Sequence, residues 1–134
     1  MIPAHSASVA VSSPRAGARP VVVAVQLRYE MQCGWPGPGT VTIRFPAAMA
    51  VPDRILATDV LVDGKPATSV VGHGRQEVVG MPPRHGILCD LMGPGLLRIT
   101  FTRAARLGNP KAPGSYALHA LRGAMGFTAP FVVR

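Results

Sequence analysis

Hydrophobic and polar residues alternate over several short stretches of the chain. Between Val21 and Cys33 the apolar side chains occupy the odd positions, and Thr40 to Phe45 and Leu96 to Thr102 repeat the same period of two. In a β-strand this period places one face in a core and the other in water. The pattern predicts amphipathic strands in these three stretches, and it suggests that the first two pair as a hairpin.

The clearest turn in the chain is Asp63-Gly64, which separates Val60–Val62 from Lys65–Val71. Asp-Gly readily adopts the positive φ angles of a two-residue type I′ turn, so these segments are predicted to form a hairpin. Pro66 cannot donate a backbone hydrogen bond, which places the second arm at a sheet edge. Further strands are expected at Ser8–Ser12, Gln76–Val79, Ile87–Leu91, Ser115–Leu121 and Phe127–Val133, and a helical turn near Pro52–Ile55.

Composition supports an all-β domain. The 134 residues include 15 Gly and 14 Pro, which interrupt helices and fall mainly between the alternating stretches. Short apolar runs with turns at this spacing predict a β-sandwich of about 8 to 10 antiparallel strands. Residues 1–19 are expected to be a flexible N-terminal segment that holds the first short strand, and residues 20–134 a single sandwich domain.

The formal net charge is +8, with 14 Lys and Arg against 6 Asp and Glu. The arginines are spread along the chain, and the closest grouping is Arg98, Arg103 and Arg106. Dispersed arginines are typical of solvated strand faces and predict no specific nucleic-acid partner, whereas a polyanion surface is the alternative. No apolar stretch reaches the roughly 18 residues of a membrane helix, so no membrane insertion is expected. The first residues do not have the pattern of a secretory signal peptide.

Several motifs occur in a recognisable order: Gly39-Thr-Val-Thr-Ile-Arg-Phe-Pro46, Val51-Pro-Asp-Arg-Ile55, Asp59-Val-Leu-Val-Asp-Gly64, Leu107-Gly-Asn-Pro110 and Pro113-Gly-Ser-Tyr-Ala-Leu118. Over about residues 20–134 the chain resembles immunoglobulin-like β-sandwich modules of large secreted and cell-surface proteins of Firmicutes, often found beside S-layer homology domains. The resemblance implies an architectural module without catalytic residues, located outside the cell or in its envelope. Its partners would be a cell-wall polymer or other protein modules. It also implies that Tyr116 ties down its turn through the hydroxyl group.

The two cysteines allow two arrangements. Cys33 and Cys89 are separated by 55 residues and both have inward parity. A disulfide between them would stabilise the fold by roughly 4 kcal/mol in the chain-entropy model. Two separate buried thiols are the alternative, because free cysteine is a common core residue.

Metal-binding and catalytic patterns are weak. His73, His85 and Cys89 are the candidate ligands, but no Cys-x-x-Cys or His-x-x-x-His spacing occurs. His5 and His119 are expected to be solvated. Nucleophile motifs of the Gly-x-Ser-x-Gly type and phosphate-binding glycine loops are absent, and no pair of carboxylates is indicated. The sequence therefore predicts no metal, no cofactor and no enzymatic activity.

Trp35 lies in the glycine- and proline-rich loop Gly34–Gly39. Either it folds back over one end of the sandwich, or it stacks on sugar rings. The leading hypothesis is a non-catalytic structural, assembly or adhesion module of an exported or cell-envelope protein. The alternative is a polyanion- or carbohydrate-binding sandwich that uses Trp35 and the surface arginines Arg98, Arg103 and Arg106.

Overall fold

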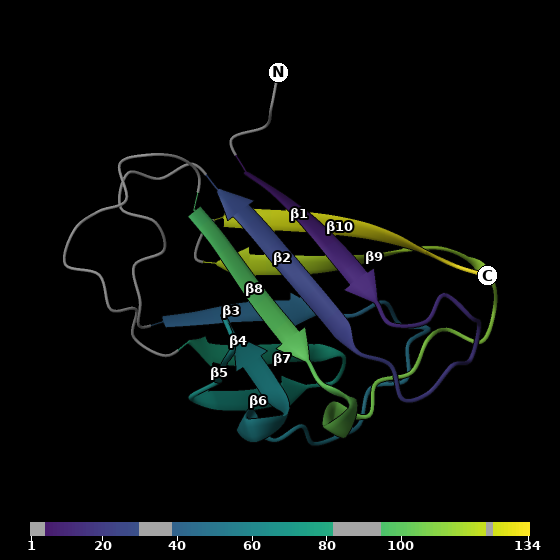
Figure 1. Ribbon diagram of the computed structural model, residues 1–134, viewed down its shortest axis with the longest axis horizontal. Coiled ribbons are helices and arrows are strands. Elements are labelled where there is room, and N and C mark those ends of the chain that lie inside the picture. Colours follow the sequence, from purple (N-terminus) through teal and green to yellow (C-terminus); the bar gives the residue numbers. More distant parts are fainter. Residues whose placement is uncertain (1–4, 30–38, 82–94, 123–124) are drawn as a thin grey trace.

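The computed structural model describes residues 5–29, 39–81, 95–122 and 125–134 (Figure 1). In these residues the chain forms strands joined by turns and two short 3-10 helices, η1 (Ala57–Asp59) and η2 (Arg103–Ala105). The strands are β1 (His5–Val11), β2 (Val23–Tyr29), β3 (Gly39–Arg44), β4 (Val60–Val62), β5 (Lys65–Pro66), β6 (Ser69–His73), β7 (Gln76–Met81), β8 (Gly95–Phe101), β9 (Gly114–Arg122) and β10 (Met125–Val133).

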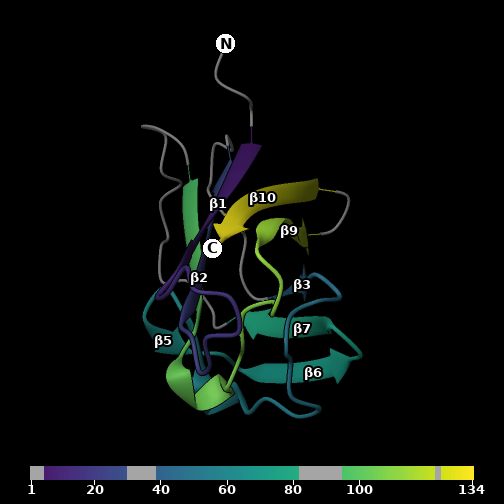
Figure 2. The same cartoon turned by 90° about the vertical axis from the view of Figure 1, so that its right-hand side faces the viewer.

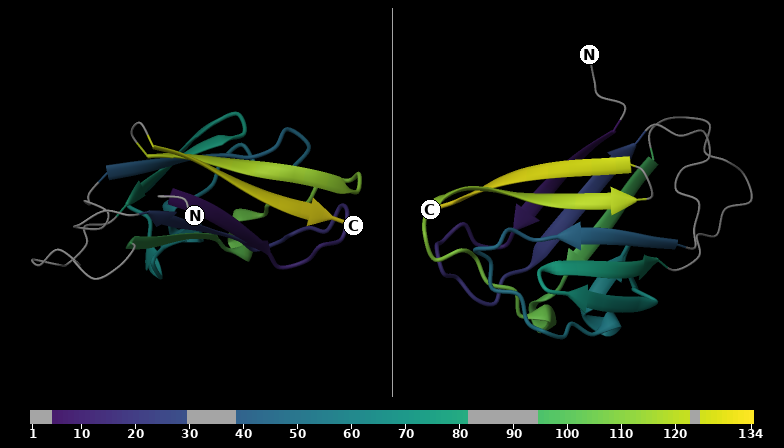
Figure 3. Two further views of the ribbon diagram at one scale, coloured as in Figure 1. Left: turned by 90° about the horizontal axis from the view of Figure 1, so that it is seen from above. Right: turned by 180° about the vertical axis from the view of Figure 1, so that it is seen from behind.

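The strands make two antiparallel sheets of five strands each. The first sheet has the order β1-β2-β8-β4-β5, and the second has the order β10-β9-β3-β7-β6. The sheets form two layers, seen side by side in Figure 2 and one above the other in the left panel of Figure 3. The all-β sandwich predicted from the sequence is confirmed, and its immunoglobulin-like character stays a prediction.

The alternation of apolar residues determines which side chains fill the space between the sheets. Val23, Val25 and Leu27 of β2 are buried, while the even-numbered residues between them are partly exposed. The same rule holds along β3, β8 and β10, and in β9 from Leu118 to Leu121. Phe45 and Phe101 meet edge to face across the two sheets, with ring centroids 5.1 Å apart. The core is therefore continuous from one sheet to the other, as burial of both inner faces requires.

At one side of the sandwich the N-terminal segment is hydrogen-bonded to the C-terminal end of the chain. Ala16 N–H donates to the carbonyl of Arg134 at 2.8 Å, and Arg134 N–H donates to the carbonyl of Pro14 at 2.7 Å. The buried Asn109 side chain donates through Nδ2 to the carbonyls of Ser13 and Arg15, at 2.7 and 2.8 Å. The strand expected at Ser8–Ser12 is present as β1, which begins earlier and pairs with β2 over its whole length.

At the opposite side the chain passes from one sheet to the other. Asp63 and Gly64 have φ angles of 51° and 85°, as the predicted hairpin turn requires, and Pro66 lies on the edge strand β5. The second arm is divided, however. Ala67 N–H donates to Val60 in the first sheet, whereas Thr68 N–H donates to Gly80 in the second sheet. The predicted segment Lys65–Val71 thus supplies both β5 and β6.

Two local predictions are wrong. β2 and β3 do not form a hairpin, because β2 pairs with β1 and β8 while β3 pairs with β7 and β9 in the other sheet. Alternation identifies the buried face of a strand but not its neighbour, which depends on contacts distant in sequence. The helical turn is η1 at Ala57–Asp59 rather than Pro52–Ile55. The strand expected at Ile87–Leu91 lies outside the described residues.

Candidate functional site

Several residues singled out in the sequence lie outside the described part of the chain. They are Cys33, Trp35, His85 and Cys89. The choice between a disulfide and two buried thiols therefore stays open, as does the role of Trp35. Within the described ranges, no group of three or more His, Cys, Asp or Glu residues is arranged to hold a metal ion.

The three grouped arginines are all exposed but occupy different places. Arg98 lies in the middle of β8, on the outer face of the first sheet. Arg103 begins η2, beyond the end of β8, and Arg106 follows that turn with a left-handed φ of 57°. Arg98 borders a hollow in the surface. A site that uses all three arginines together stays a prediction.

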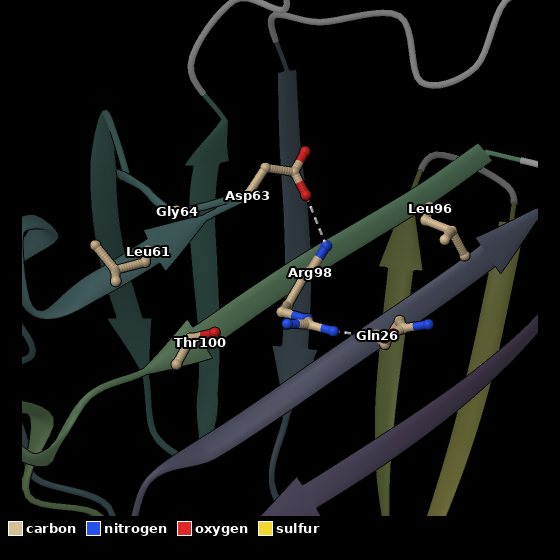
Figure 4. A pocket seen from close by; sticks show the side chains of 7 residues that line it. All are labelled: Gln26, Leu61, Asp63, Gly64, Leu96, Arg98 and Thr100. Atoms are coloured by element: carbon tan, nitrogen blue, oxygen red, sulfur yellow. Dashed lines mark hydrogen bonds between the residues drawn. The ribbon is translucent and has the colours of Figure 1, made fainter. Parts of the chain in front are cut away.

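The hollow beside Arg98 is an open groove of about 520 Å³ on the outer face of the first sheet (Figure 4). Its walls come from β2, β8 and the β4–β5 turn, because neighbouring strands place their outward residues side by side. Arg98 is paired with Gln26 of β2, and Thr100 is paired with Leu61 of β4. The lining residues are Gln26, Leu61, Asp63, Gly64, Leu96, Arg98 and Thr100.

Hydrogen bonds fix the central residue of this groove. Arg98 Nη2 donates to Gln26 Oε1 at 3.2 Å. The backbone N–H of Arg98 donates to Asp63 Oδ1 at 3.0 Å, and the N–H of Asp63 donates to the Arg98 carbonyl at 2.8 Å. The Asp63 carboxylate therefore stands at the same groove as the guanidinium and offsets its charge. The arrangement suits a polar ligand of little net charge better than a polyanion.

The outer face of the second sheet has a pattern that the sequence analysis missed. Cross-strand pairing brings Val71, Val78, Thr42, Leu121 and Gly126 into one row across all five strands. Val71 and Leu121 are 50% and 45% exposed. We call this uncharged line the apolar row. Outward parity could have identified each member, but the register that aligns them cannot be obtained from the alternation alone.

The adjacent outward row is polar. It contains Gln76, Arg44, His119 and Thr128, on β7, β3, β9 and β10. Arg44 Nη2 donates to Gln76 Oε1 at 3.0 Å, and Nδ1 of His119 lies 3.2 Å from Oγ1 of Thr128. The expected exposure of His119 is confirmed. We call this line the polar row; together the two rows make the outer face of the second sheet amphipathic.

One carboxylate is buried inside the sandwich. Glu77 on β7 points inward with Val79 and Met81, and its side chain is only 1% exposed. In the part of the chain that the structure describes, its Oε2 has no hydrogen-bond partner. Across the strand pair, Gly72 leaves room for this carboxyl group, since a Cβ there would be 2.5 Å from Oε2. Burial raises the pKa of Glu77 from 4.5 to about 7, because desolvation disfavours the charged form.

Comparison with known proteins gives a likeness of fold. No family model matches the sequence, and no curated protein matches it. The structure is similar to the crystal structure of BslA, which is described as a bacterial hydrophobin, with a TM-score of 0.55. The two chains are 14% identical, and the match covers 97% of this chain and 96% of BslA. At that identity the likeness concerns the fold alone.

Proposed function

We propose that the protein is a non-catalytic structural or assembly module of an exported or cell-envelope protein, and that it assembles with further copies of itself. The observation that carries this proposal is the apolar row. It runs across all five strands of the second sheet and carries no charged residue. Larger apolar patches on a protein surface mark interaction sites, and Val71, Val78 and Leu121 are the apolar side chains that this row contributes to such a patch.

A second copy of the chain suits this surface. The only Asp or Glu in the five strands of the second sheet is Glu77, which is buried on the inner face. The outer face therefore offers no charge-pairing group to a basic partner. In contrast, a row of uncharged small and medium residues, three of them apolar, can pack against the same row of a second copy about a two-fold axis.

The size of the row indicates a weak association. Neighbouring strands lie about 4.8 Å apart, so five strands span roughly 19 Å. A stable interface usually buries about 800 Å² on each partner, which is more than one row of side chains provides. We therefore expect association at high local concentration, as in an array or beside other modules of a longer chain.

The fold comparison supports the same class of function. BslA is described as a bacterial hydrophobin, which is compatible with a bacterial protein that has a structural role outside the cell. In the described part of the chain there is no helix long and apolar enough to cross a membrane. A cell-wall polymer or neighbouring protein modules, implied by the resemblance to surface modules, are further proposed partners.

Sedimentation velocity over a wide range of protein concentration tests self-association. The double variant Val71→Thr/Leu121→Thr makes the row polar while keeping residues that fit strands. We expect the parent protein to show a concentration-dependent oligomer and the double variant to remain a monomer with an unchanged melting temperature. Val132→Thr is the matched control, because Val132 is 58% exposed on β10 but lies outside the row. A monomeric parent at every concentration, or equal loss in the control, would refute the assignment.

The groove beside Arg98 favours a second candidate function, the binding of a carbohydrate. It offers an amide, a guanidinium and a hydroxyl group beside Leu61 and Leu96. Neutral oligosaccharides should then shift the NMR signals of Arg98 and Thr100, and Arg98→Gln should weaken binding. Trp35→Ala tests the predicted contribution of the Gly34–Gly39 loop. Retention on polyanion columns that does not depend on salt concentration would exclude the polyanion form of this alternative.

A further inference from the structure

A second hollow lies on the outer face of the second sheet, which faces the viewer in the right panel of Figure 3. It has a volume of about 250 Å³ and lies where the apolar row and the polar row adjoin on β3, β9 and β10. The side chains that matter for its chemistry are Thr42, Arg44, His119, Leu121 and Thr128, and Gly126 lines it on the edge strand β10.

The hollow exists because a side chain is missing from the sheet. Gly126 is paired with Leu121 in the β9–β10 hairpin. An added Cβ at Gly126 would meet only Leu121 Cδ2, at 3.6 Å, which is ordinary contact distance. The position therefore tolerates a side chain sterically, and the glycine leaves a space beside Arg44 and His119 that larger residues would fill.

Polar groups border this space in an ordered arrangement. Arg44 and His119 are directly opposite each other on β3 and β9. The hydrogen bond to Gln76 orients the Arg44 guanidinium and uses one of its five N–H donors. Thr128 is placed beside the His119 ring, 3.2 Å from Nδ1. The residues that border the hollow thus include an arginine, an imidazole and hydroxyl groups.

The charge balance distinguishes this hollow from the groove on the first sheet. Among the described residues that line it there is no Asp or Glu, and the one acid in the strands of this sheet, Glu77, is buried on the other side. Beside Arg98, by contrast, the Asp63 carboxylate lines the same groove. A negatively charged ligand is therefore attracted more strongly to Arg44 than to Arg98, although both arginines project from the middle of an outer face.

We propose that this hollow binds the carboxylate of an acidic saccharide unit. A guanidinium matches a carboxylate through two parallel N–H donors. The hydroxyl groups of Thr42 and Thr128 both donate and accept hydrogen bonds, which suits the hydroxyls of a sugar, and Leu121 provides apolar surface for its C–H groups. The volume accommodates one small unit rather than a large ligand. The site is separate from the Arg98 groove and does not require self-association.

Titration with a tetramer of galacturonic acid, followed by amide NMR and calorimetry, tests the proposal. The measurements are made at protein concentrations where the chain is monomeric, so that failure of self-association does not affect them. The acid tetramer should bind and shift the signals of Arg44, His119 and Gly126. Its methyl ester lacks the charge. The affinity for the ester should be lower by about tenfold or more, as expected when a charged hydrogen-bond pair is lost. Equal binding of acid and ester, or binding of polyphosphate alone, would overturn the proposal.

Three variants locate the site. Arg44→Gln removes the guanidinium, and Gly126→Val narrows the hollow without changing the charge. Each should weaken binding of the acid tetramer about tenfold or more. Arg54→Gln is the matched control, because it removes the same charge from an exposed position that lines neither the Arg98 groove nor this hollow, and it should leave binding unchanged. Equal losses for Arg44→Gln and Arg54→Gln would indicate unspecific attraction to a basic protein and would refute the site. Unchanged binding in Gly126→Val would refute it as well.

Discussion

Replacing Glu77 with glutamine should make the protein more stable at and above neutral pH. Glu77 is 1% exposed, its Oε2 has no hydrogen-bond partner among the described residues, and burial raises its pKa from 4.5 to about 7. Below pH 4.5 the group is protonated in both the folded and the unfolded chain. Between pH 4.5 and 7 the unfolded chain releases the proton while the folded protein retains it. The free energy of unfolding therefore falls as the pH rises through this window.

The size of the effect follows from the two pKa values. One pKa unit corresponds to about 1.4 kcal/mol, so a shift from 4.5 to about 7 lowers stability by about 3 kcal/mol once the pH exceeds 7. Glutamine has nearly the same shape and no charge. Glu77→Gln should therefore remove the dependence in this window, and above pH 7 it should gain up to about 3 kcal/mol, less the cost of burying an amide.

Urea unfolding below pH 4.5, within the window and above pH 7 measures this dependence. Asp53→Asn is the control, because it removes an exposed carboxylate and should leave the fall in stability as in the parent protein. If the parent is equally stable on both sides of the window, or if Glu77→Gln retains the full dependence, the inference that Glu77 is desolvated in the folded protein is wrong.

Three further substitutions test contacts that hold the turns. Asn109→Ala should lower the free energy of unfolding by about 2 to 3 kcal/mol, since it removes both Nδ2 hydrogen bonds to the N-terminal segment. Chemical denaturation measures this loss, and a change below about 1 kcal/mol would contradict the prediction. Tyr116→Phe should cost about 1 kcal/mol, because the hydroxyl donates to the Ala112 carbonyl at 2.7 Å; an unchanged melting temperature would show that water replaces the bond. Gly64→Ala should cost about 1 kcal/mol, because φ at this position is 85°; Gly64→Asn, which tolerates such angles better, should cost less.

Local features of the fold were predictable where the chemistry is local. The inward positions of β2, β3 and β8 follow from alternation, and the Asp63-Gly64 turn follows from the φ angles that this pair tolerates. The hydroxyl bond of Tyr116 confirms what the resemblance to surface modules implied. In each case the cause lies within a few residues of the effect.

Features that depend on strand pairing were not predictable. Arg44 and His119 are far apart in the sequence, and they become neighbours only because β9 pairs with β3 rather than with β2. Inward parity with Val79 was the one signal that Glu77 is buried, but a glutamate is almost never fully buried without a partner. Glu77 is an exception because the neighbouring residue, Gly72, has no side chain and leaves room for the carboxyl group.

The hollow beside Arg44 and the apolar row share Leu121, so ligand binding and self-association should oppose each other. A saccharide in the hollow covers Leu121, and a second copy packed on the apolar row covers it as well. If each copy must release its saccharide before it can associate, a ligand at ten times its dissociation constant lowers the association constant about tenfold for each copy that must release it. Sedimentation velocity with the galacturonic acid tetramer should therefore shift the protein toward monomer, and the methyl ester should not. Gly126→Val should still associate but lose the response to the acid. If a saturating concentration of the acid leaves association of the parent unchanged, the second copy does not cover Leu121, and the assembly surface lies elsewhere on the molecule.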